Sequence, residues 1–303
     1  MSMLVVGTVA FDSLETPHGS VDRILGGSAM FSSMAASFFT KPRLVGVVGE
    51  DFPDHNRQIM RDRGICLDGL QTERGGKTFY WKGRYHADMN SRDTMEVHLN
   101  VLATFNPVLP ASYRDSTHVF LANSSPEVQM KVLDQVHKPL LVLADTMDFW
   151  ISSTHDDLLR LLKRIDGLLL NDSEANLLTG ESHMVRAGRK ILQMGPKFVV
   201  IKRGEHGAML ISGDGVYAIP AYPTEHVIDP TGAGDSFAGA IMGHLVAHPD
   251  GPREGRLRRA MAFGTVLASL CVEDFGPNRL KRTERTEIDE RLERYRKMLQ
   301  FWE

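Results

Sequence analysis

A run of small residues ending in a carboxylate, DPTGAGD at positions 229–235, stands directly before an apolar helical pattern. Small residues at the start of a helix leave its first backbone N–H groups uncovered, and these groups together with the helix dipole attract an anion. Glycine also lets phosphate oxygens come close, because it has no Cβ. We therefore expect the amides of Gly232, Ala233 and Gly234 to hold a phosphate group.

Asp235 is the acidic residue of this run and opens the helical pattern that continues to residue 248. A carboxylate at the start of a helix can serve as its cap. Beside an anion site it can instead take a proton from a hydroxyl group while that oxygen attacks a phosphoryl group. Because charge builds up on the transferred phosphoryl group, fixed N–H donors suit this reaction. We predict that Asp235 is a catalytic base, with a helix cap as the alternative.

Three other nucleotide-binding motifs are absent from the sequence. The chain has no G-x-x-x-x-G-K-[ST], no set of protein-kinase motifs and no G-x-G-x-x-G. A P-loop kinase, a protein kinase and a NAD-linked dehydrogenase are therefore excluded.

The elements that must position these residues alternate between short apolar strands and longer helices, which predicts a parallel sheet covered by helices. The expected strands are 3–7, 43–48, 118–121, 140–144, 167–171, 198–202 and 208–211. The expected helices are 29–39, 56–63, 126–136, 154–164, 173–179, 184–194, 235–248, 256–272 and 286–301. The last helix carries an apolar stripe interpreted as core, which consists of Ile288, Leu292, Tyr295, Leu299 and Trp302.

Two segments do not fit this alternation, at about residues 12–25 and 70–100. The second contains TFYWKGRY at 78–85, whose β-branched and aromatic residues favour strands. We interpret both segments as a small β-rich lid over the end of the sheet, with an ordinary edge hairpin as the alternative. The remainder forms one α/β domain that spans residues 1–303.

Four motifs in the same order along the chain resemble the ribokinase-like (PfkB) family of carbohydrate and nucleoside kinases. DPTGAGDSF at 229–237 resembles its C-terminal signature, and GGSA at 26–29 followed by VGVVGED at 45–51 resembles its N-terminal one. NDSE at 171–174 has the N-x-x-E form, and KRGEHG at 202–207 stands where the family has a strand followed by G-x-x-G. The resemblance implies a ribokinase-like fold and ATP-dependent phosphorylation of a hydroxyl group on a sugar or sugar derivative.

The resemblance also implies which residues bind the nucleotide and its metal ion. Asn171 and Glu174 would order Mg²⁺ and its waters around the phosphates, since Mg²⁺ keeps several waters; the alternative is a capped helix start. Lys202 and Gly204 would border ATP, whereas a lone lysine at a strand end is otherwise a solvated charge.

Two residues of the 229–235 run match positions that hold a monovalent cation such as K⁺ in some relatives. These are Asp229, assigned to the cation, and Thr231, assigned to the nucleotide side. The alternative is that both are turn residues, because the sequence Asp-Pro-Thr-Gly favours a turn.

The acceptor would be held by Asp12, whose carboxylate can accept hydrogen bonds from two neighbouring hydroxyl groups. The backbone N–H groups of Gly26 and Gly27 would lie close to the same acceptor. Ala10 and Phe31 stand where many sugar-specific relatives have asparagine, so two polar side chains are replaced by apolar ones.

The aromatic residues leave the choice of acceptor open. Phe31, together with Phe79 and Trp81 of the lid, would suit stacking on a ring or base. The alternative is that these aromatic side chains form a small core within the lid. A nucleoside kinase of the same fold, and a binding protein without activity on this scaffold, are the other hypotheses.

The composition of the chain indicates which binding partners and which cellular compartment to expect. The formal net charge is −3, with 35 basic and 38 acidic residues, so neither a nucleic acid nor a membrane is expected as a partner. The basic cluster at 253–259 is interpreted as a solvated helix face. Cys66 and Cys271 have no C-x-x-C partner, which fits a reducing cytoplasm. We expect a cytoplasmic protein that can form a homodimer through the lid strands.

Overall fold

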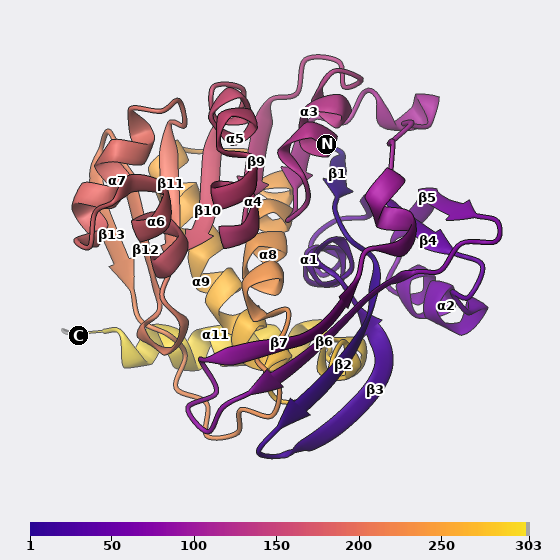
Figure 1. The fold of residues 1–303 in the computed structure, drawn as a ribbon. Helices are drawn as coiled ribbons and strands as arrows, with labels where there is room; N and C mark the ends of the chain where they lie inside the picture. Colours follow the sequence, from indigo (N-terminus) through magenta and orange to yellow (C-terminus); the bar gives the residue numbers. More distant parts are fainter. Residues whose placement is uncertain (301–303) are drawn as a thin grey trace.

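A large, mostly parallel sheet organises the computed structural model, which describes residues 1–300 (Figure 1). Its strands are β1 (Met3–Val6), β4 (Pro42–Gly49), β5 (Cys66–Glu73), β8 (His118–Leu121), β9 (Leu141–Asp145), β10 (Gly167–Asn171), β11 (Phe198–Lys202), β12 (Ala208–Ser212) and β13 (Gly215–Ile219). The strand order is β13-β12-β11-β10-β9-β8-β1-β4-β5. Within this sheet, as far as residues 1–300 describe it, only the pairings of β12 with β11 and with β13 are antiparallel.

The strands are short apolar runs because both faces of the sheet are covered. In β1, Met3 and Val5 pack into one hydrophobic core while Leu4 and Val6 pack into the other. All four of these side chains have an exposed fraction of 0%. A parallel arrangement places the carboxyl ends of neighbouring strands at the same edge of the sheet, and this edge carries the candidate site.

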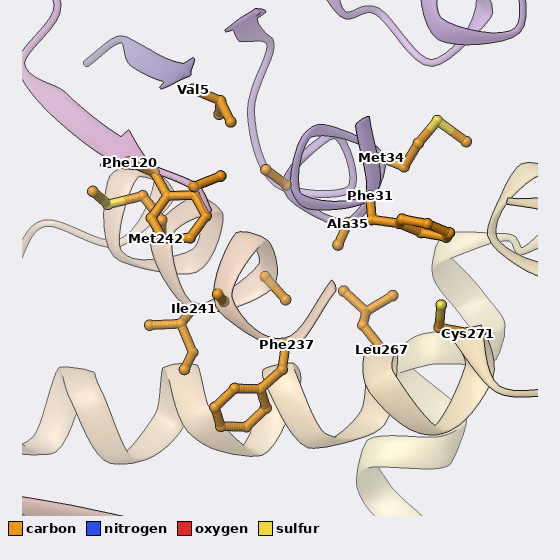
Figure 2. Close-up of a cluster of buried hydrophobic side chains, with 14 of the residues drawn as sticks. Val5, Phe31, Met34, Ala35, Phe120, Phe237, Ile241, Met242, Leu267 and Cys271 are labelled. Atoms are coloured by element: carbon orange, nitrogen blue, oxygen red, sulfur yellow. The ribbon is translucent and has the colours of Figure 1, made fainter. Parts of the chain in front are cut away.

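Helices form a layer on each face of the main sheet. One layer contains α1 (Ser28–Ala36), α2 (Asp54–Asp62), α8 (Ala233–Ala247), α9 (Arg253–Cys271), α10 (Asn278–Arg282) and α11 (Arg285–Met298). The other contains α3 (Pro126–Leu133), α4 (Asp148–Ser153), α5 (His155–Leu162), α6 (Asp172–Thr179) and α7 (Met184–Leu192). Figure 2 shows side chains of α1, α8 and α9, including Phe31 and Phe237, gathered in the first core.

A second sheet of four strands stands apart from the main one (Figure 1). It has the order β3-β2-β6-β7, with β2 (Ala10–Thr16), β3 (Gly19–Gly26), β6 (Phe79–Tyr85) and β7 (Arg92–His98). The expected β-rich segments thus form a sheet of their own, and the interpretation as an edge hairpin of the main sheet is wrong. Residues 70–73, which we assigned to the lid, belong to β5 because they pair with β4 in the main sheet.

The fold expected from the sequence is confirmed, with differences at element ends. β8, β10 and β11 have the predicted bounds, whereas α1 ends three residues before the predicted Phe39. In α11, Ile288 and Tyr295 are buried as expected, and Trp302 lies outside the described residues. The short helices α4 and α10 and the strand β13 were not predicted. Among residues 1–300, no helix has both the length and the apolarity needed to cross a bilayer.

Candidate active site

Three polar side chains meet where β9, β10 and β11 end, because these neighbouring strands run parallel. They are Asp145, Asn171 and Lys202. The Nζ of Lys202 donates to Oδ2 of Asp145 at 2.6 Å, and the side chains are 19% and 3% exposed respectively. Burial lowers the pKa of Lys202, but the charges of Asp145 and Glu174 outweigh it and raise the pKa above its usual value. Lys202 is therefore a partly buried, paired cation, and the solvated-charge interpretation is wrong.

Asn171 and Glu174 form the start of α6. The Oδ1 of Asn171 accepts from the N–H of Glu174, and Oε2 of Glu174 accepts from the N–H of Asn171, both at 2.7 Å. This is a reciprocal capping box, so the capped helix start that we considered is present. Burial, with a smaller contribution from Asp145, raises the pKa of Glu174 to about 7 against the opposing charge of Lys202.

The glycine-rich run turns into α8 as expected. Gly232 is the N-cap residue with φ 77°, and Ala233 and Gly234 are the first residues of the helix. A Cβ on Gly232 would overlap the ring of Phe31, and a Cβ on Gly234 would lie 3.4 Å from Nζ of Lys202. Only glycine fits between the helix start and the Phe31 ring. The N–H of Ala233 donates to the carbonyl of Pro230 at 3.2 Å, whereas the N–H groups of Gly232 and Gly234 have no partner among residues 1–300.

Asp235 is the third residue of α8, and no side chain caps this helix. The interpretation of Asp235 as a helix cap is therefore wrong. Burial, followed by the charge of Asp145, raises the pKa of Asp235 to about 6, while Lys202 and Arg92 act to lower it. A carboxyl group with this pKa is mostly ionised at neutral pH and can accept a proton.

Asp229 and Thr231 hold the turn that precedes α8. The Oδ1 of Asp229 accepts from the N–H of Thr231, and its Oδ2 accepts from the N–H of Gly276, both at 2.9 Å. Asp229 is fully buried, and burial raises its pKa. The Oγ1 of Thr231 donates to Oη of Tyr85 at 3.1 Å, which ties the turn to the second sheet. Both residues therefore form a turn in the structure, as the alternative interpretation predicted.

Asp12 lies on β2 with its carboxylate against Gly26, where a Cβ would overlap it. The N–H of Gly27 acts to lower the pKa of this carboxyl group. Burial, followed by the charges of Asp229 and Asp235, raises the pKa of Asp12 to about 8. The influence of Asp235 shows that the two carboxyl groups lie within electrostatic reach of each other. That Asp12, Gly26 and Gly27 bind the acceptor stays a prediction.

The aromatic residues proposed for the acceptor do not form one surface. Phe31 is 1% exposed and packs into the core with its ring on Gly232. The ring of Trp81 covers Gly83, and its Nε1 donates to Thr94 at 3.2 Å. Trp81 thus packs on its own sheet, and the side chain of Phe31 supports the turn before α8.

A cleft of about 490 Å³ opens beside the start of α8. Lys202, Gly204, Ala233 and Gly234 line one side of it. Residues 88–90, in the turn between β6 and β7, line the cleft as well, and Nδ2 of Asn90 donates to Glu205 at 3.4 Å. The second sheet therefore reaches over the edge of this cleft.

Sequence reasoning missed two charged residues of the site. Asp145 directly follows an apolar strand at the edge that also holds Asn171 and Lys202, and this position was the signal that could have identified it. Arg92 begins β7 of the second sheet, and its charge lowers the pKa of Asp235. The sequence held no signal for Arg92, because its position depends on how the two sheets pack.

Comparisons with known proteins agree with this geometry. Residues 8–284 match the pfkB family carbohydrate kinase pattern. The cytidine kinase of Thermococcus kodakarensis is 31% identical over 252 residues, which cover 80% of this chain and 87% of that protein.

Two solved structures share the fold. A putative ribokinase II from E. coli, in complex with ATP and Mg²⁺, has a TM-score of 0.80 at 21% identity and covers 97% of this chain and 99% of its own. The nucleoside kinase of Burkholderia thailandensis, in complex with inosine, has a TM-score of 0.75 at 20% identity, with coverages of 97% and 96%.

Proposed function

The chain belongs to the pfkB family of carbohydrate kinases, and we propose that it transfers the γ-phosphoryl group of ATP to a hydroxyl group of a sugar or sugar derivative. The observation that carries this proposal is the position of Asp235. Its carboxyl group, with a pKa of about 6, lies on the first turn of α8, beside the unpartnered amides of Gly232 and Gly234 and the partly buried cation Lys202. A base next to an anion site is the arrangement that phosphoryl transfer needs.

The residues around the cleft fit a magnesium nucleotide. The glycines at 204 and 234 keep the approach to Lys202 free of side chains, so phosphate oxygens can reach it. Among residues 1–300, no group of three His, Cys, Asp or Glu side chains could hold a metal ion alone. This supports Mg²⁺ bound through phosphate oxygens and waters, with Glu174 orienting the waters. When bound, the nucleotide supplies the phosphoryl group that is transferred.

The chain's own residues then have separate tasks. Asp12, with Gly26 and Gly27 beside its carboxyl group, orients the acceptor, and Asp235 takes the proton from its attacking hydroxyl group. The amides of residues 232–234 and the Nζ of Lys202 stabilise negative charge on the transferred group. Residues 88–90 cover the edge of the cleft and reduce the access of water, which would otherwise compete as an acceptor.

A nucleoside is the second candidate for the acceptor. The observation that favours it is the 31% identity to a cytidine kinase over most of both chains. Ala10 and Phe31 agree with this candidate, because they replace side chains with which many sugar-specific relatives are expected to bind a free sugar.

The test is ATP consumption with Mg²⁺ against a panel of sugars, sugar phosphates and nucleosides, with Asp235→Asn as the control protein. Turnover on one acceptor should fall by at least ~10² in kcat in the variant, the lower range for a general base, with ATP binding retained. Activity with cytidine or inosine but not with free sugars would select the nucleoside. Near-full activity of the variant would refute the role of Asp235.

Three further expectations remain proposals. A K⁺ ion near Asp229 is tested by turnover in K⁺ against Na⁺ buffers, and equal rates would refute it.

A homodimer through the second sheet is supported by Met95 and Val97 on β7, which are 49% and 46% exposed. Val97→Lys should then shift the mass in light scattering from dimer to monomer. A cytoplasmic location rests on two cysteines that are both free thiols.

A further inference from the structure

A second cavity, of about 280 Å³, lies at the amino ends of the parallel strands, the edge of the main sheet opposite the candidate active site. Its walls come from the starts of β8, β9 and β11 and from the region where α8 ends and α9 begins. The sheet side is largely apolar, with Leu140, Leu141 and Phe198, whereas α9 contributes Arg253 and Arg256.

His118 presents a nitrogen without a partner to this cavity. The residue is 3% exposed, and its Nδ1 lies 3.0 Å from Oγ1 of Thr117. That hydroxyl group also lies 3.1 Å from the carbonyl oxygen of Ser2, to which it can donate. The other ring nitrogen of His118, Nε2, has no hydrogen bond within residues 1–300.

The charges around the cavity do not balance. Lys197 pairs with Asp166 at 2.6 Å, and the other oxygen of Asp166 accepts from the N–H of Val142 at 2.9 Å. This pair cancels, which leaves the two arginine charges and the ammonium group of Met1, whose charge also acts on His118. Arg253 is exposed and forms no ion pair or hydrogen bond in the described part of the chain.

Arg256 is positioned by the end of α8. Its Nε and Nη2 donate to the carbonyl groups of His248 and Leu245, at 2.9 Å and 3.0 Å. Its Nη1 has no acceptor among residues 1–300 and remains available to a ligand. Burial, followed by the charge of Arg256, lowers the pKa of His118 to about 4. An anion in the cavity would oppose this positive field and allow Nε2 to become a third donor.

We propose that this cavity is a second anion site, at which His118, Arg253 and Arg256 bind the phosphate group of a small molecule. The guanidinium group of arginine carries several N–H donors in one plane, so it can bind two oxygens of a phosphate group at once, unlike the ammonium group of lysine. The apolar wall and the volume leave room for an organic body attached to that group. The basic segment 253–259 is thus only partly a solvated helix face, because two of its arginines line a cavity.

Calorimetric titration with inorganic phosphate tests the site, with a non-hydrolysable ATP analogue and Mg²⁺ present to occupy the amides of α8. Arg253→Gln should weaken binding about tenfold or more, as expected for a lost charge-assisted hydrogen bond. The matched control is Arg259→Gln, which removes an exposed charge from the same helix outside the cavity and should change affinity by less than about twofold. Equal weakening in both variants, or no binding by the unmodified protein at millimolar phosphate, would overturn the proposal.

A second readout does not depend on the arginine variants. Nuclear magnetic resonance of the His118 imidazole should show its pKa rising when phosphate is added, and an unchanged titration would also overturn the proposal. Ribose 5-phosphate then identifies the source of the phosphate group. Tighter binding than inorganic phosphate would indicate a phosphomonoester, and weaker binding would indicate the free ion.

Discussion

Replacing Gly232 by alanine tests whether the turn before α8 is shaped by the ring of Phe31. Two costs arise. Gly232 has φ 77°, and an L-residue in this conformation loses about 1–2 kcal/mol. The new Cβ would also overlap the Phe31 ring, and overpacking of this kind costs about 1–3 kcal/mol. We therefore expect Gly232→Ala to lower the free energy of unfolding by about 2–5 kcal/mol in urea titrations.

Gly180 provides the matched control, because it has φ 71° and no atom lies within 4 Å of the place that a Cβ would take. Gly180→Ala should lose only the conformational cost of about 1–2 kcal/mol and keep its activity. Gly232→Ala should in addition lose about 10² in kcat, since displaced amides no longer meet the transferred group. In a Phe31→Ala background the steric part should vanish. Equal destabilisation of the two alanine variants with unchanged kcat would refute the reasoning.

The remaining predictions concern charge. Lys202→Met removes a cation that lowers the pKa of Asp235, so the acid limb of the profile of kcat/KM against pH should move from about 6 to higher pH. Lys197→Met, which breaks a lysine–aspartate pair of the same 2.6 Å length at the other end of β11, should leave the limb in place. Glu174→Gln should raise the Mg²⁺ concentration needed for half-maximal rate, and an unchanged titration would make Glu174 a purely structural cap. Asp12→Ala should raise KM for the acceptor more than KM for ATP; the opposite pattern would mean that the two pockets are misplaced.

The main sheet could be predicted because its strands are apolar runs with polar ends. In β10 and β11 the buried runs end at Asn171 and Lys202, so the last residue of each strand is a candidate site residue. The pairing of Lys202 with Asp145 could not be predicted in the same way. The two residues are 57 positions apart, and only the order of strands in the sheet brings them together.

The second sheet and the role of Phe31 depend on packing that no local pattern encodes. β2 pairs in parallel with β6, about 70 residues later, so strand propensity alone could not give this register. Phe31 reaches Gly232 because α1 and α8 lie very close together. Gly239 and Gly243 permit this approach, since a Cβ at either would press on the backbone of α1 at Ser32 or Ala36. No local sequence pattern shows which ring these two glycines bring to the turn.

The electrostatics of the site support the proposal that Asp235 is the base. Asp12, Glu174 and Asp235 all have raised pKa values, of about 8, 7 and 6, with burial as the largest cause in each. Buried carboxyl groups with raised pKa values oppose folding, so stability does not explain their presence. Lys202 acts to lower the pKa of both Glu174 and Asp235, and Arg92 acts on Asp235 in addition. At neutral pH it is the most fully ionised of the three, and an ionised carboxylate beside uncovered amides is the group that can accept the hydroxyl proton.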